Sequence, residues 1–103
     1  MLALRVEIAR FVDDAQPGWV ECRLVDRAGR EHRFVEKLPV VTAQDLGPDS
    51  DYPRPGAIAC TLIERRTGDA GEVIVVDTEA PWGVTSTAGA HRFEVLAAQL
   101  QDL

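Results

Sequence analysis

The residues most able to do chemistry in this chain are one histidine and the polar side chains near it. His91 follows Ser86 by five positions in a glycine-containing segment, and Asp77 follows the most apolar stretch of the chain. Burial at such a strand end would raise the pKa of Asp77 and suit it to acid–base work. These residues define a candidate hydrolase or isomerase site in which His91 acts with Ser86 or Asp77. The competing interpretation is a turn or a helix cap around Ser86 and a solvated carboxylate at the strand end.

Metal ligands do not converge in the sequence. His32 and Glu36 share one face of an expected strand, but four residues of strand separate them by roughly 13 Å, which prevents joint chelation. Asp45, Asp49 and Asp51 lack the glycine and glutamate positions of a calcium-binding loop. We therefore expect no metal site and no cofactor.

Composition and charge exclude several classes of partner. The formal net charge is -6, and all of it comes from residues 38–103, which disfavours binding to nucleic acid or to an anionic membrane. No run approaches the roughly 20 apolar residues of a membrane span, and the alternating first residues differ from a signal peptide. Cys22 and Cys60 lie far apart among apolar neighbours and are expected to be buried and reduced. We expect a cytoplasmic protein.

Two connections stiffened by proline and glycine carry large amphipathic side chains. Tyr52 and Arg54 belong to segment 42–56, and Trp82 belongs to segment 77–91. Such side chains on rigid loops often anchor binding surfaces, although they could instead plug the ends of a small barrel. We expect a non-enzymatic, accessory or immunity-type protein-binding module whose partner has a basic surface. The alternative hydrolase or isomerase requires a pocket between these two loops.

Alternating apolar residues predict the strands that position these loops. Segment 2–8 alternates regularly, and a change of phase near Ala9 indicates a bulge. Segments 20–25 and 30–36 predict a hairpin, because a three-residue loop with Gly29 at the position of positive φ places Cys22 opposite Phe34. Segments 57–63 and 73–76 predict a second hairpin, whose latter strand is central and buried on both faces.

The C-terminal segment fits two structures. Its apolar residues from Phe93 onward fall at helical spacing and predict a short helix, and alternation over residues 91–95 fits a sixth strand nearly as well. We expect residues 1–103 to form a single, mainly β domain, an antiparallel meander of five or six strands closed or half-closed into a barrel. An open sheet with the helix across one face is the alternative. Because segment 2–8 lacks proline and has few charges, we also consider self-association through its edge.

Overall fold

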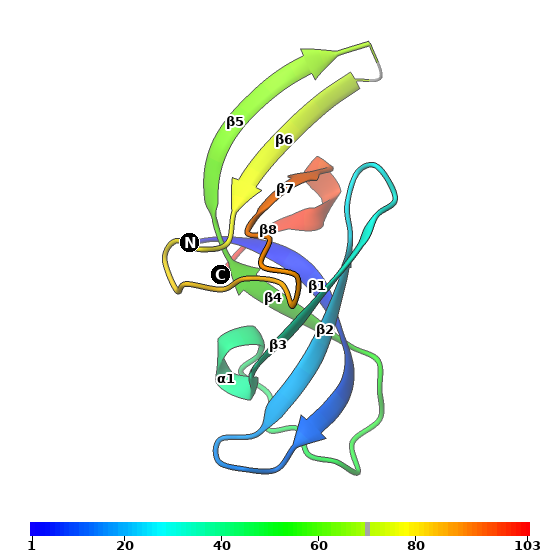
Figure 1. Ribbon diagram of the computed structural model, residues 1–103, viewed down its shortest axis with the longest axis vertical. Helices are drawn as coiled ribbons and strands as arrows, with labels where there is room; N and C mark the ends of the chain where they lie inside the picture. The colour runs from blue at the N-terminus through cyan, green and yellow to red at the C-terminus, as the bar shows by residue number, and fades with distance from the viewer. Residues whose placement is uncertain (70) are drawn as a thin grey trace.

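The computed structural model describes residues 1–69 and 71–103, which form two antiparallel sheets and one very short helix (Figure 1). The elements, in chain order, are β1 (Leu2–Asp13), β2 (Trp19–Val25), β3 (Glu31–Lys37), α1 (Leu38–Val41), β4 (Arg54–Ala59), β5 (Thr61–Gly68), β6 (Gly71–Asp77), β7 (Arg92–Val95), the 3₁₀ turn η1 (Ala97–Gln99) and β8 (Leu100–Asp102). The expected mainly β, antiparallel architecture is confirmed.

The first sheet is built around β1. Its strand order is β3-β2-β1-β4, and β8 pairs with the first residues of β1. The predicted hairpin of β2 and β3 is confirmed, and so is its register. Cys22 lies opposite Phe34, and Gly29 in the loop has a φ of 83°. The predicted bulge is also present, as a register shift between Ile8 and Arg10 in the β1–β2 ladder. Since β1 has partners on both sides, it is not the free edge considered above.

The second sheet has the order β5-β6-β7. The run 57–63, expected as one strand, divides at Cys60: β4 stays beside β1, while β5 pairs with β6 in the other sheet. Leu62, expected on the inner face with Cys60, is therefore exposed. In Figure 1 the β5–β6 hairpin rises well away from the first sheet. As predicted, β6 is the central strand of its sheet, with Ile74 and Val76 buried.

The predicted C-terminal helix is wrong. Residues 92–95 form β7, in which Phe93 and Val95 are buried and alternate with exposed Arg92 and Glu94. Only one turn of 3₁₀ helix follows, and then β8 pairs with β1. The competing strand at this position is confirmed, because the free edge of β6 offers a full set of ladder partners.

The sheets do not close into a barrel. Among the described residues, only single backbone hydrogen bonds approach closure: Arg27 N donates to Glu94 O at 2.8 Å, and Thr87 N donates to Arg33 O at 2.7 Å. In the part of the chain that the structure describes, β3 and β5 are each at the edge of their own sheet and do not pair with each other. Side chains of both sheets nevertheless share one apolar core.

The short helix α1 sits beside β4 and shapes the surface around it. Pro39 occupies its first turn, a position that leaves no hydrogen bond unmade. Leu38 and Val41 point into the core, and the Leu38 N–H donates to Gly18 O at 2.8 Å. This hydrogen bond ties α1 to the turn between β1 and β2, and α1 also packs beside β4. Within the described residues, no helix has the length and apolar character needed to cross a bilayer.

Candidate functional site

Asp77, Glu79 and His91 come together at one end of the second sheet. Asp77 ends β6 and His91 precedes β7, and antiparallel pairing of these strands places Asp77 opposite Arg92. The Thr78 N–H donates to His91 O at 2.8 Å and fixes the two chain segments side by side. One potential ligand atom of each of the three residues lies within 4.8 Å of the others.

Asp77 is the buried anchor of this cluster. Its Oδ1 accepts hydrogen bonds from the Glu79 N–H at 2.8 Å and from His91 Nδ1 at 3.0 Å, while Oδ2 accepts one from Arg92 Nε at 3.1 Å. Burial raises the pKa of Asp77, but these hydrogen bonds outweigh burial and hold the pKa below its usual value. The expectation of a raised pKa is therefore wrong, and Asp77 is an ionised carboxylate that orients His91.

The other ring nitrogen of His91 faces a second carboxylate. An ionised Asp77 only accepts hydrogen bonds, so His91 Nδ1 carries the proton in their contact. Nε2 then lies 3.3 Å from Oε2 of Glu79, whose side chain is 61% exposed. In a neutral imidazole, Nε2 is an acceptor, and two facing acceptors repel each other unless a proton, a metal ion or a water lies between them.

Ser86 belongs to a turn and does not join this cluster. Its hydroxyl accepts the Ala90 N–H at 3.0 Å, and its backbone N–H donates to Ala90 O at 2.7 Å. Among the described residues no hydrogen bond connects Ser86 with His91. Of the two pairings in the alternative catalytic site, the structure therefore forms the one between Asp77 and His91 and leaves Ser86 out of it.

Trp82 lines an apolar groove between the two long connections. Its side chain is exposed, with a residue exposure of 49%, and it borders a hollow of about 200 Å³. The other lining residues are Pro39, Val40, Val41, Thr42, Ala43, Ala57 and Leu103. A second hollow of about 210 Å³ shares five of these residues and continues past Ala57 to Pro55 and Gln101. We call the two hollows together the Trp82 groove.

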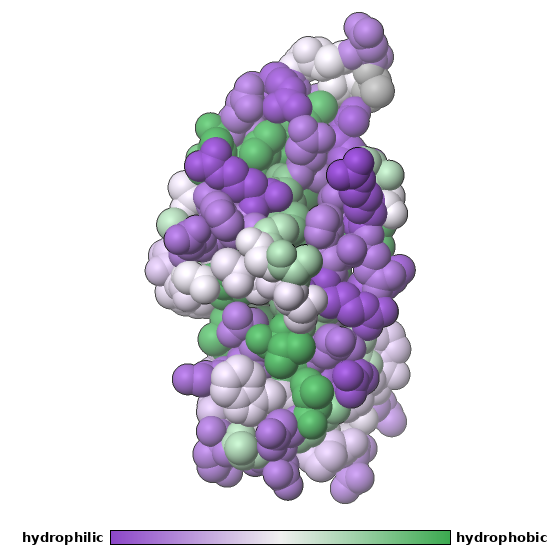
Figure 2. Space-filling view, in the orientation of Figure 1, coloured by the Kyte–Doolittle hydropathy of each residue, from purple (hydrophilic) through white to green (hydrophobic). Residues whose placement is uncertain are grey.

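The groove carries no ionisable side chain, and its walls are mostly aliphatic. In Figure 2 a strip of hydrophobic surface lies beside the region where Figure 1 places α1, bordered by hydrophilic residues. A pocket does therefore connect segments 42–56 and 77–91, as the enzyme alternative requires. Asp77, Ser86 and His91 do not line it, so it offers apolar contact without acid–base groups.

Tyr52 and Arg54, the other expected anchors, are not among the residues that line the Trp82 groove. Tyr52 is half-buried against the core. Its hydroxyl donates to Gly47 O at 2.7 Å and so links the two ends of the 47–52 loop. Arg54 Nε donates to Asp51 O at 2.8 Å. These contacts give both side chains a role within their own loop.

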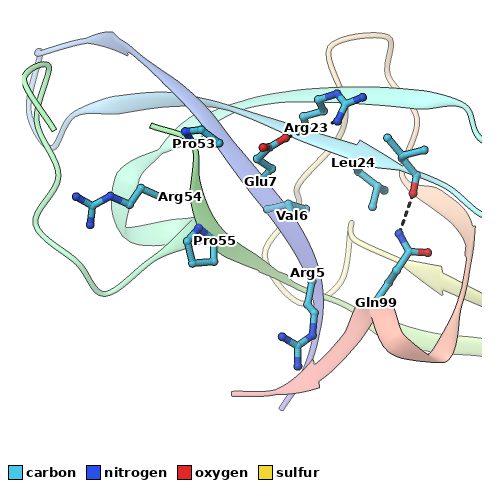
Figure 3. Close-up of a pocket in the computed structure, with 10 residues that line it drawn as sticks. Arg5, Val6, Glu7, Arg23, Leu24, Pro53, Arg54, Pro55 and Gln99 are labelled. Atoms are coloured by element: carbon cyan, nitrogen blue, oxygen red, sulfur yellow. Dashed lines mark hydrogen bonds and ion pairs between the residues drawn. The ribbon is translucent and has the colours of Figure 1, made fainter. Parts of the chain in front are cut away.

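Arg54 also borders a larger, more polar hollow of about 380 Å³ (Figure 3). This hollow lies where β1 and β2 separate, because their ladder ends at Glu7 and Arg23. Gln99 crosses the gap with a 2.7 Å hydrogen bond from Nε2 to Val25 O, the dashed line in Figure 3. Arg23 contacts Glu7 at 3.5 Å and Glu31 at 3.0 Å, so one of the cations of this hollow is already neutralised.

Sequence reasoning missed most of the walls around Trp82 and the role of Glu79 beside His91. The aliphatic run Pro39-Val40-Val41 was visible as a signal for an apolar wall. Leu103 reaches the groove only through the unexpected β8, which the helical spacing concealed. No protein-family model, curated protein or solved structure matched this chain.

Proposed function

We propose that this chain is a non-enzymatic protein-binding module that receives an apolar side chain of its partner in the Trp82 groove. The observation that carries the proposal is an exposed tryptophan beside an aliphatic hollow held open by stiff segments. Tryptophan in such a setting supplies a large contact area at small entropic cost, and it is enriched among residues that dominate binding energy.

The groove is rigid because its walls are tied to the core. Val41 and Ala57 are buried, and α1 fixes segment 39–43 beside β4. On the opposite side, the Thr78 hydroxyl donates to Val84 O at 2.8 Å, and the Gly83 N–H donates to Glu79 O, closing the turn that presents Trp82. A preformed groove spares the partner the cost of ordering the site on binding.

Charge favours a partner with a basic surface. Residues 38–103, which supply both loops beside the groove, contain ten acidic and four basic side chains. An acidic surface speeds encounter with a basic partner and repels acidic competitors. We therefore propose an apolar side chain flanked by lysine or arginine as the recognised feature, in a cytoplasmic setting.

A peptide pair tests this proposal. Peptides with a central leucine flanked by lysines, or by glutamates, are titrated into the protein and followed by tryptophan fluorescence in a Trp19→Phe background, where Trp82 is the only reporter. We expect the lysine peptide to bind more tightly than the glutamate peptide, with a difference that shrinks as salt is added.

Two variants complete the design. Trp82→Ala, followed by calorimetry because it removes the reporter, should abolish peptide binding and leave the melting temperature nearly unchanged. Leu96→Ser, which removes an equally exposed apolar side chain that lines neither hollow of the groove, should leave binding intact. Equal loss of stability and binding in Trp82→Ala would instead assign Trp82 to the core, and equal binding of both peptides would refute the basic partner.

A further inference from the structure

We propose that His91 Nε2 and the Glu79 carboxylate form a binding site for zinc or a similar divalent transition-metal ion, with Asp77 orienting His91 from behind. The site lies at the junction of β6 and β7 and does not depend on the Trp82 groove. Imidazole nitrogen and carboxylate oxygen together suit zinc, whereas magnesium and calcium prefer oxygen ligands alone.

The spacing of the two ligand atoms supports this assignment. Zinc–nitrogen and zinc–oxygen bonds of about 2.1 Å at a tetrahedral angle place two ligand atoms about 3.4 Å apart. The separation of His91 Nε2 and Glu79 Oε2 is 3.3 Å. An ion therefore fits without rearrangement of the backbone, and the exposed Glu79 side leaves room for water at the remaining positions.

The contacts behind His91 match the usual support of a metal-binding histidine. Such a histidine commonly donates its other ring N–H to a carboxylate, which fixes the tautomer and makes the ligand more basic. Here Asp77 Oδ1 accepts that proton from Nδ1 at 3.0 Å. Arg92 contacts the other oxygen, Oδ2, so two carboxylates and one guanidinium leave the cluster with one net negative charge before an ion binds.

The two cysteines and the other histidine of the described residues are poorly placed to bind the same zinc ion. Both cysteines are buried, and burial raises the pKa of Cys22 to about 12 and that of Cys60 to about 11. His32 Nε2 is already occupied by Asp26 at 2.8 Å, and its ring packs against Phe93 with centroids 4.8 Å apart. His91 is thus the histidine whose second nitrogen opens toward a free carboxylate.

Calorimetry with zinc chloride on the whole chain at about pH 8, where protons compete weakly for imidazole, tests the proposal. We expect one zinc ion to bind, with no response to magnesium or calcium. Glu79→Gln and His91→Gln should each weaken binding at least about tenfold. Glu72→Gln, which changes a similarly exposed glutamate that pairs with Arg65, is the matched control and should leave binding unchanged.

Nitrogen-15 spectra of the two imidazoles locate the ion independently of affinity. Zinc should shift Nε2 of His91 and leave His32 unaffected. The proposal is overturned if zinc does not bind, if it shifts His32 instead, or if neither Glu79→Gln nor His91→Gln weakens it. In the first of these outcomes, the contact between His91 and Glu79 is an ion pair held by a proton alone.

Discussion

Gly56 lines the Trp82 groove and packs closely against the core behind it, and Gly56→Ala is the sharpest test of the packing described above. In β4 it pairs with Val6 of β1. A Cβ at this position would lie 2.8 Å from Ile8 Cγ1, 3.1 Å from Ile8 Cδ1 and 3.2 Å from the Val41 carbonyl oxygen. Ile8 is fully buried and Val41 nearly so, so neither neighbour has free space to retreat into.

The expected cost follows from this overlap. Adding one methyl group to a closely packed core destabilises a protein by about 1 to 3 kcal/mol. Gly47→Ala is the matched control, because a Cβ there meets no atom within 4 Å and its φ is not positive. The control should stabilise the protein by about 0.4 to 1 kcal/mol through the unfolded state. Relative to the control, Gly56→Ala should therefore lose at least about 1 kcal/mol, or roughly 4 to 8 °C in melting temperature.

Urea unfolding followed by far-ultraviolet circular dichroism measures this difference as a lower midpoint at unchanged slope. In an Ile8→Val background, which removes Cδ1, the Gly56→Ala change should cost at least about 0.5 kcal/mol less than in the wild type. Equal midpoints for Gly56→Ala and Gly47→Ala would refute the reasoning. Strict additivity of Gly56→Ala and Ile8→Val would show that the strain does not arise from Ile8 Cδ1, since valine retains the closer Cγ1.

Two further predictions concern ionisable groups. Burial raises the pKa of Asp26, but hydrogen bonds from His32 and from the following turn outweigh burial and lower the pKa. Such a carboxylate stabilises the fold above its unfolded pKa of about 3.9. That stability is lost as the pH falls through the pKa of the folded state. Asp26→Asn should thus flatten the acid side of a plot of urea midpoint against pH, and an unchanged slope would contradict this. Burial raises the pKa of Cys22 to about 12 and that of Cys60 to about 11, so an aromatic disulfide reagent at about pH 8 should modify both only after unfolding; rapid reaction of the native protein would disprove it.

The first hairpin could be predicted because independent signals coincide in it. Turn chemistry at Gly29 and the apolar alternation that pairs Cys22 with Phe34 require the same register. The C-terminal segment had no such agreement. Spacing from Phe93 to Leu103 fits a helix, while alternation of Phe93 and Val95 fits a strand, and the choice depended on the free edge of β6, which is a tertiary feature.

Sheet closure and the candidate sites were less predictable for the same reason. The apolar run through Cys60 gives no sign that the chain changes sheets there, so Leu62 was assigned to the wrong face. Asp77 and His91 were recognised as potential partners, but the position of Glu79 follows from the turn after β6. The exposure of Trp82 agrees with its place in a proline- and glycine-containing loop, whereas the opposite wall comes from segments distant in sequence.

The departure of β5 from the first sheet separates the molecule into a part that holds the fold together and a part that does not. All side chains of β5 are exposed, so this strand adds little to the apolar interior. Its sequence is consequently free to change far more than that of β1 or β4. For protein engineers, the outer part of this strand is the natural place to attach a fluorophore or to graft a foreign epitope. Thr61 at its start should be kept, because it pairs with Asp77 and its hydroxyl donates to Ala80 O in the loop that presents Trp82.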